Sequence, residues 1–253
     1  MRKLLIIGIG AGDPEQVTVQ AIKALNRADV FFVVDKGDVT KDLMTARQEI
    51  CERYIENGSY RIVSIPEPER DRTAPAYRQA VEEWRGERAA IWARAIEDEL
   101  PDGGCGALLV WGDPALYDSV LAIVGQVTAA SGMEITCEVI PGISSVQALA
   151  ASHRVSLTRV GRPLHITTGR RLAEEGMPAG CDDVVVMLDA SCSFTRVDPD
   201  TEIYWGAYLG TPDEILLSGT VGKVGAEIRA ARNEARTRKG WIMDTYLLRR
   251  SAT

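Results

Sequence analysis

The sequence predicts an α/β protein built from two α/β domains. The first observation is the short apolar run 3–9, which ends next to glycine and is typical of a buried parallel strand. The second observation is that apolar residues recur at helical spacing over 17–28 and that a second apolar run follows at 30–34. This strand–helix–strand order is the βαβ unit of α/β folds. The third observation is that residues 159–253 are rich in short apolar runs, which predicts a smaller mixed α/β domain.

The first domain is predicted to span 1–158, with an insertion around 38–104. Pro14 stands near the start of the first helix, where its missing N–H costs little. Further apolar runs predict strands at 61–65, 107–111 and 135–140. Helical spacing predicts helices at 41–56, 76–100, 119–130 and 146–151.

The second domain is predicted to span 159–253 and to follow a linker at 156–163. One long helix is predicted at 221–235, directly before the last strand. Strands are predicted at 164–167, 184–188, 203–209 and 241–248.

Charge and composition exclude several classes of function. Lys and Arg total 29 against 36 Asp and Glu, and the net charge of −7 disfavours non-specific binding to nucleic acid or to an anionic membrane. The sequence has no long unbroken apolar run, so no membrane-spanning helix is expected. The five cysteines form no C-x-x-C pair and only two histidines are present, which predicts a reduced, cytoplasmic compartment and no metal site.

Glycine-bearing turns follow three of the predicted strands in the first domain: GIGAGDP, WGDP and PGISS. Ligands of open parallel sheets bind at the carboxyl ends of the strands, and glycine lets a ligand approach the backbone closely. The three turns together therefore predict one binding crevice. The alternative is that each turn merely needs a positive φ.

A dinucleotide site is the obvious alternative for the first turn. The G-x-G-x-x-G fingerprint needs a third glycine at position 13, where Asp13 stands, and a carboxylate there would repel a pyrophosphate. Asp35, at the end of the second strand, could still act as the acid that binds a ribose. A nicotinamide-dependent oxidoreductase is therefore a weaker alternative.

Several segments carry a family resemblance. GIGAGDPEQVTVQAIKALNRADVFFV, WGDPALYDS and VIPGISSVQALAASHRVSLT resemble, in this order, the landmark motifs of the tetrapyrrole methylases. ITTGR, VVVML and LGTPDE…SGTV resemble the landmarks of that family's second domain. The resemblance implies S-adenosylmethionine as methyl donor, bound in a trough between two α/β domains, a tetrapyrrole substrate, and a homodimer.

The resemblance also implies which residues contact the cofactor. Carried over position by position, they are Ala11, Gly112, Asp113, Leu116, Ser144, Ser145, Met187 and Gly210. Without the resemblance, Asp113 would be interpreted as an Asx turn, Ser144 as a helix cap and Met187 as a core residue.

The insertion carries a narrower resemblance. DKG…KDL…ERDR…AYRQAVEEW is similar to the branch of the family that methylates ring carbon 1 of precorrin-5 and releases an acetyl group as acetate. The substrate's many carboxylates call for arginine, and the candidates are Arg70, Arg72, Arg170 and Arg171. Asp35 is a candidate for orienting the water that attacks the acetyl group, although helix capping or a turn is the better explanation from the residues alone.

The sequence departs from the wider family in two places. Thr168-Gly169-Arg170 stands where T-G-H is usual, and 188–202 is too short and polar for the helix usually found there. Methyl transfer is an in-line displacement that needs no protein nucleophile, so no catalytic residue is assigned. Another tetrapyrrole C-methyltransferase and a non-catalytic tetrapyrrole carrier remain alternatives.

Overall fold

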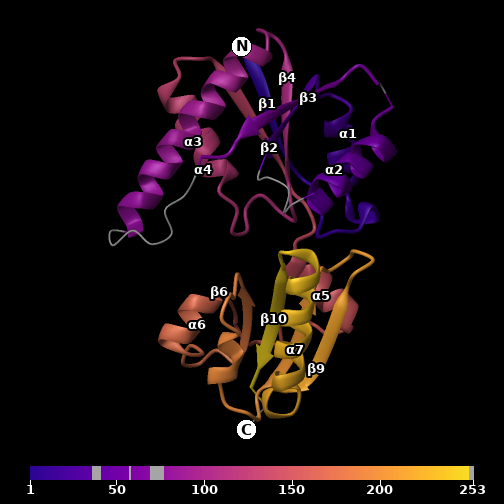
Figure 1. Ribbon diagram of the computed structural model, residues 1–253, viewed down its shortest axis with the longest axis vertical. Coiled ribbons are helices and arrows are strands. Elements are labelled where there is room, and N and C mark those ends of the chain that lie inside the picture. The colour runs from indigo at the N-terminus through magenta and orange to yellow at the C-terminus, as the bar shows by residue number, and fades with distance from the viewer. Residues whose placement is uncertain (36–40, 57, 69–76, 251–253) are drawn as a thin grey trace. The chain divides into compact units, whose positions relative to one another are not determined.

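The computed structural model describes residues 1–35, 41–56, 58–68 and 77–250, and it divides into two compact units (Figure 1). The first unit comprises 1–10 and 14–143, and the second comprises 11–13 and 144–253. Among the described residues, no helix has both the length and the apolar character needed to cross a membrane.

The first unit contains a five-stranded parallel sheet with the order β3-β2-β4-β1-β5. In this order β1 lies between β4 and β5, with Ile7 paired to Leu109 on one side and to Ile140 on the other. The turns that follow these three strands are therefore neighbours. The strands are β1 (Arg2–Gly8), β2 (Val30–Asp35), β3 (Arg61–Pro66), β4 (Cys105–Val110) and β5 (Ile135–Ile140).

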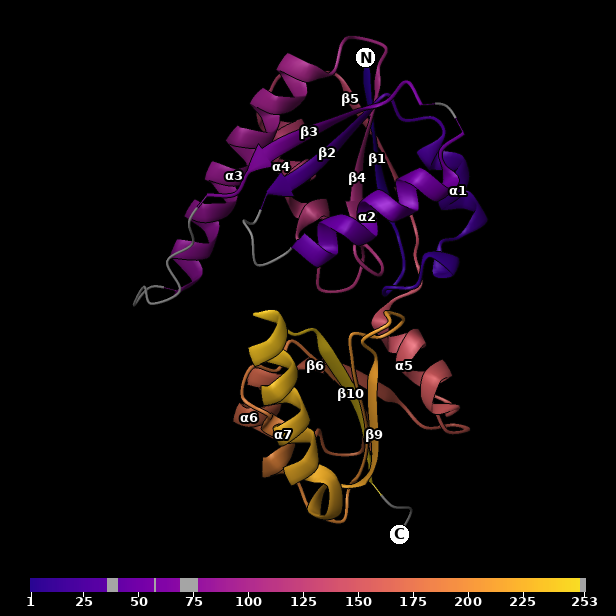
Figure 2. The same cartoon turned by 45° about the vertical axis from the view of Figure 1, so that its right-hand side comes forward.

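Helices cover both faces of the first sheet (Figures 1 and 2). Alternate residues of β1 point to opposite faces: Leu4 and Ile6 join a core with Trp92, whereas Leu5 and Ile7 join another core. The first core includes residues of α3 (Tyr77–Glu99) and α4 (Val120–Ala130), and the other includes residues of α1 (Val19–Leu25) and α2 (Lys41–Tyr54). Burial on both faces explains why β1 is a continuous apolar run.

The second unit contains a mixed five-stranded sheet with the order β6-β7-β10-β8-β9. β6 and β7 are parallel, whereas β10 is antiparallel to both of its neighbours, β7 and β8. The strands are β6 (Leu164–Thr168), β7 (Asp183–Met187), β8 (Glu202–Ala207), β9 (Ile215–Thr220) and β10 (Asp244–Arg249).

Residues of α6 (Gly169–Glu175) and α7 (Val221–Lys239) pack into one core on this sheet, together with the short 3-10 helix η3 (Ser193–Arg196). On the other face, α5 (Ser145–His153) packs on β8 and β10. Gly206 of β8 permits this contact, because a Cβ there would lie 2.9 Å from Leu149 Cδ1.

The α/β class predicted from the sequence is confirmed, and most predicted elements are present with small shifts at their ends. The helix α6, the 3-10 helix η3 and the strand β9 were not predicted. α6 and η3 are short, and β9 is a half-exposed edge strand that lacks the apolar run of the central strands. The structure also groups α5 with the second unit, whereas the sequence analysis assigned its residues to the range 1–158.

Candidate functional site

Three glycine turns meet at the carboxyl end of the first sheet, as the sequence predicted. Gly112 donates its N–H to the carbonyl of Gly10 at 2.7 Å, and the two residues form an isolated β-bridge. A Cβ on Gly142 would lie only 2.2 Å from the carbonyl oxygen of Gly112, and one on Gly8 would lie 2.6 Å from the Gly142 nitrogen. The glycines are therefore required because the turns pack backbone against backbone.

Asp113 joins two of these turns. Its Oδ2 accepts a hydrogen bond from the Gly142 N–H at 2.9 Å, and its Oδ1 accepts one from the Ala115 N–H at 2.8 Å. The second bond is the Asx turn that the alternative interpretation expected. Each oxygen keeps a second lone pair, so the carboxylate can still accept a hydrogen bond from a ligand. Leu116 is half-buried and donates its N–H to the Asp113 carbonyl at 3.3 Å.

Arg88 supports the same loop and was missed by the sequence analysis. Its buried guanidinium donates from Nη1 to Ser119 Oγ at 2.9 Å and forms an ion pair with Glu67 through Nε at 2.9 Å. It lies against the rings of Trp84 and Trp92, at 4.8 and 5.2 Å from their centroids. Burial lowers the pKa of Arg88, although Glu67 opposes this. In the sequence, the signal that could have identified Arg88 is the spacing Trp–x₃–Arg–x₃–Trp, which places the three side chains on one face of a helix.

The first turn does not have the geometry of a dinucleotide site. α1 begins at Val19 with Thr18 as its N-cap, after the 3-10 helix η1 (Pro14–Gln16). The glycines therefore do not stand at a helix N-terminus that could hold a pyrophosphate. Ala11 is buried, and a Cβ on Gly12 would lie 2.5 Å from the carbonyl oxygen of Leu209.

In the second unit, Ser144 and Ser145 have different surroundings. Ser144 is 5 % exposed and caps α5, because its Oγ accepts the Val146 N–H at 3.2 Å and donates to Gln147. Its hydroxyl is therefore used to cap the N-terminus of the helix. Ser145 Oγ lies 3.3 Å from Thr245 Oγ1, a residue that the sequence analysis did not single out.

Met187 is the last residue of β7 and pairs with Thr168 on β6 and with Thr245 on β10. Ser145, Thr245 and the half-buried Met187 thus form a group of two hydroxyls beside a thioether at one edge of the sheet. Gly210 has a φ of 75° and donates its N–H to Glu214 Oε2 at 2.8 Å, so that donor is used within the protein.

The structure describes the predicted substrate residues only in part. Arg170 is exposed in the first turn of α6, which Thr168 caps. Asp35 ends β2 and pairs with Pro66, and its backbone alone is described. Arg70 and Arg72 lie outside the described residues.

Each unit, taken by itself, offers groups that an adenosine-bearing sulfonium cofactor can use. The first unit offers a carboxylate with spare acceptor capacity at Asp113, and the second offers hydroxyls beside the adaptable apolar surface of Met187. Within the part of the chain that is described, no group of His, Cys, Asp and Glu could hold a metal ion.

Comparisons with known proteins give a consistent result. The family model described as Tetrapyrrole (Corrin/Porphyrin) Methylases matches residues 3–225. The Precorrin-6A synthase [deacetylating] of Sinorhizobium sp is 50% identical over 253 residues, which cover 100% of this chain and 97% of that protein. A crystal structure of a cobalamin synthesis related protein (CobF) from Corynebacterium diphtheriae has a TM-score of 0.84 and 38% identity, with 98% of each chain covered.

One further crystal structure holds a ligand. It is the uroporphyrin-III C-methyl transferase from Thermus thermophilus complexed with S-adenosylhomocysteine, at a TM-score of 0.61 and 18% identity, covering 97% of this chain and 91% of that one. At that identity the likeness shows a shared fold.

Proposed function

The chain belongs to the tetrapyrrole (corrin/porphyrin) methylase family, and from this we propose that it is an S-adenosylmethionine-dependent C-methyltransferase that converts precorrin-5 to precorrin-6A with release of acetate. The observation that carries the proposal is the 50% identity to a deacetylating precorrin-6A synthase over the whole length of the chain. That identity spans both units and the insertion, so it includes the segments most able to distinguish one tetrapyrrole from another.

S-adenosylmethionine supplies a methyl group on a positively charged sulfur when it is bound. Asp113 accepts hydrogen bonds from its ammonium or ribose hydroxyls, Ser145 and Thr245 bind the adenosine, and Met187 lies against the adenine. The other contacts are made through the backbone of Ala11, Gly112, Leu116, Ser144 and Gly210.

The chain's part in methyl transfer is positioning. Holding two reactants in line contributes about 7–11 kcal/mol to lowering a barrier, so no covalent nucleophile is needed. Arg70, Arg72 and Arg170 pair with the substrate's carboxylates. Asp35 orients the water that adds to the acetyl carbonyl, and breaking the C–C bond then leaves the electron pair on the ring as acetate departs.

Incubation with precorrin-5 and S-adenosylmethionine tests the proposal, with the pigment followed by mass spectrometry and free acetate measured in parallel. We expect a pigment that has gained one methyl group and lost its acetyl group, together with an equal amount of acetate. Methylation without acetate would indicate another tetrapyrrole C-methyltransferase. Pigment binding without methyl transfer would indicate a carrier. In a separate fluorescence titration, saturable binding of NADH would indicate an oxidoreductase.

The proposal also includes the organisation of the enzyme. It is a cytoplasmic homodimer with domains at 1–158 and 159–253. Light scattering coupled to size-exclusion chromatography checks the oligomeric state, because a mass near that of one chain would contradict a dimer.

A further inference from the structure

Five non-glycine residues in the described chain have a left-handed backbone: Tyr117, Arg154, Leu188, Cys192 and Tyr208. This conformation is unfavourable for an L-residue with a side chain, whereas glycine adopts it readily. Such a residue persists where the surrounding structure holds it and the side chain has a use.

Most of these residues have a structural explanation. Arg154 is the C-cap of α5, and its N–H donates to carbonyls of the last helical turn. The side chains of Cys192 and Tyr208 are buried at 8% and 2% exposure, where they pack in the core. Tyr117 lies in the loop that Asp113 organises. Leu188 is the most exposed apolar residue of the five, at 65% against 46% for Tyr117, and its φ is 53°.

The backbone of Leu188 is held in place by the residue that follows it. Asp189 is 3% exposed, and its carboxylate accepts hydrogen bonds from the Ser193 N–H and the Tyr246 hydroxyl, each at 2.6 Å. Its carbonyl accepts a hydrogen bond from Arg232 Nη2 at 2.7 Å. On the other side, Met187 is fixed in the sheet. The turn is therefore rigid, and it displays an apolar side chain to solvent without any gain in packing.

We propose that Leu188 contacts the substrate, with its side chain lying against an apolar face of the tetrapyrrole ring; this inference rests on the function proposed above. Leu188 directly follows Met187, a cofactor residue of that proposal, at the carboxyl end of β7. Arg170 stands at the corresponding end of the adjacent strand β6, two residues beyond Thr168, which pairs with Met187. This edge thus combines an exposed apolar group with a guanidinium. A flat ring with an acidic rim is the ligand that uses both.

Leu188→Gly separates a binding role from a structural role. Glycine relieves the left-handed strain, so the melting temperature is expected to stay the same or rise. The KM for precorrin-5 is expected to rise about 10-fold, equivalent to about 1.4 kcal/mol, with the affinity for S-adenosylhomocysteine unchanged. Leu188→Met keeps an apolar side chain and should restore most of the KM. Val160→Asn, at a fully exposed apolar residue of the same unit, is the control and should leave the KM unchanged.

The outcomes are distinct. An unchanged KM in Leu188→Gly, or a raised dissociation constant for S-adenosylhomocysteine, would overturn the role of Leu188 in substrate binding while the proposed function stands. A melting temperature several degrees lower would show that Leu188 packs within the protein, and would overturn it too. If the unmodified enzyme does not methylate precorrin-5, the proposed function fails and the inference fails with it.

Discussion

Among the single residues of the candidate site, Asp113 has a structural role that is compatible with the cofactor-binding role proposed for it. The same carboxylate closes the turn after β4 and accepts the Gly142 N–H from the turn after β5. A carboxylate that accepts hydrogen bonds from two backbone segments fixes their spacing, and its remaining lone pairs then face a ligand from a set position. The Asx-turn interpretation and the cofactor interpretation are therefore compatible.

We expect Asp113→Ala to lower both stability and cofactor affinity. Two backbone donors lose their acceptor, which costs about 1–3 kcal/mol of the free energy of unfolding. Asp118→Ala is the matched control in the same loop, because Asp118 Oδ1 accepts the Val120 N–H at the start of α4. Urea denaturation measures stability, and calorimetry with S-adenosylhomocysteine measures affinity. Equal loss of affinity in both variants would mean that Asp113 acts through loop order alone.

The ion pairs of Glu138 predict how the stability of the first unit depends on pH. Lys3 Nζ lies 2.7 Å and Arg27 Nη2 2.9 Å from its carboxylate, and the hydrogen bonds lower the pKa of Glu138 from 4.5 to about 2. A lowered folded-state pKa stabilises the protein above pH 4.5, and this contribution is lost as the pH falls from 4.5 toward 2.

The carboxylate is one-third exposed, so its contribution is at most about 1 kcal/mol. We expect Glu138→Gln to reduce the fall in stability across that pH range, as measured by urea denaturation. Glu97→Gln, at an exposed carboxylate on α3, is the control. Identical pH slopes in the wild type and in Glu138→Gln would contradict the pKa assignment.

At the scale of elements, adjacency in the sheet brings the candidate site together. Because β1 lies between β4 and β5, the turns after these strands pack on one another, and glycine is the residue that fits between them. Gly142 shows this most directly, since a Cβ there would meet backbone atoms of both other turns within 3 Å. Backbone atoms shift less easily than the end of a side chain, so a residue larger than glycine at this position would force the turns apart.

We therefore expect Gly142→Ala to lower the free energy of unfolding by about 2–3 kcal/mol and to weaken binding of S-adenosylhomocysteine. Gly125→Ala provides the opposite case, because that position in α4 has nothing within 4 Å of a Cβ. Alanine is the better helix former, so stability there should rise by about 0.5–1 kcal/mol. Urea titrations of both variants make the comparison, and a neutral Gly142→Ala would show that the turns can move apart.

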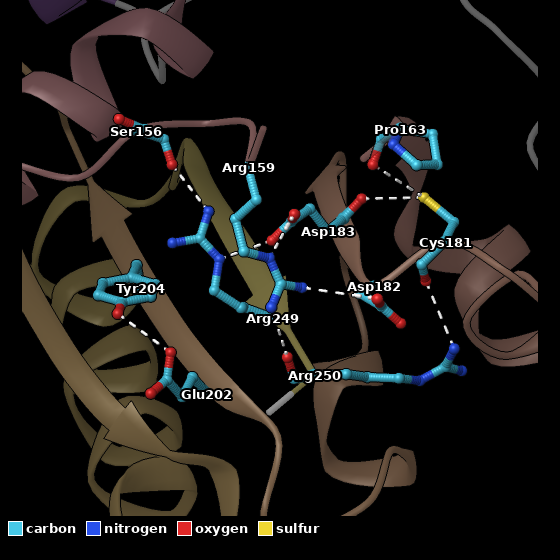
Figure 3. Close-up of polar contacts among 10 residues, drawn as sticks. All are labelled: Ser156, Arg159, Pro163, Cys181, Asp182, Asp183, Glu202, Tyr204, Arg249 and Arg250. Atoms are coloured by element: carbon cyan, nitrogen blue, oxygen red, sulfur yellow. Dashed lines mark hydrogen bonds and ion pairs between the residues drawn. The ribbon is translucent and has the colours of Figure 1, made fainter. Parts of the chain in front are cut away.

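At the scale of the whole molecule, each unit has its own core. Residues 156–163, predicted as a linker between the domains, lie within the second unit instead. Figure 3 shows Asp183, fully buried, between Arg159 and Arg249. Arg249 Nε donates to Asp183 at 2.6 Å and Arg159 Nε at 3.0 Å, while Arg249 Nη2 donates to the Ser156 carbonyl at 2.7 Å. This cluster fastens the chain that follows α5 to the starting end of β7 and to the end of β10.

We expect Asp183→Asn to destabilise the second unit by about 3–5 kcal/mol, because two arginines would lose their buried partner. Glu15→Gln removes one partner of the exposed Glu15–Arg53 pair, 2.8 Å apart, and should cost less than about 1 kcal/mol. Hydrogen exchange followed by mass spectrometry localises the effect. Faster exchange in β7 and β10 with unchanged protection in β1 is the expected result, and equal loss in both units would contradict it.

Features that depend on local chemistry could be predicted from the amino-acid sequence. Apolar periodicity predicted the central strands and long helices, and the glycine turns indicated where the candidate site would form, because these patterns repeat within a few residues. Long-range packing was needed to show that Asp113 bridges two turns and that Thr245 lies beside Ser145. The same is true of Arg88 and Asp183, whose partners lie far away in the chain. Burial and pairing of a polar group are set by strand order and long-range packing, and no local pattern encodes them.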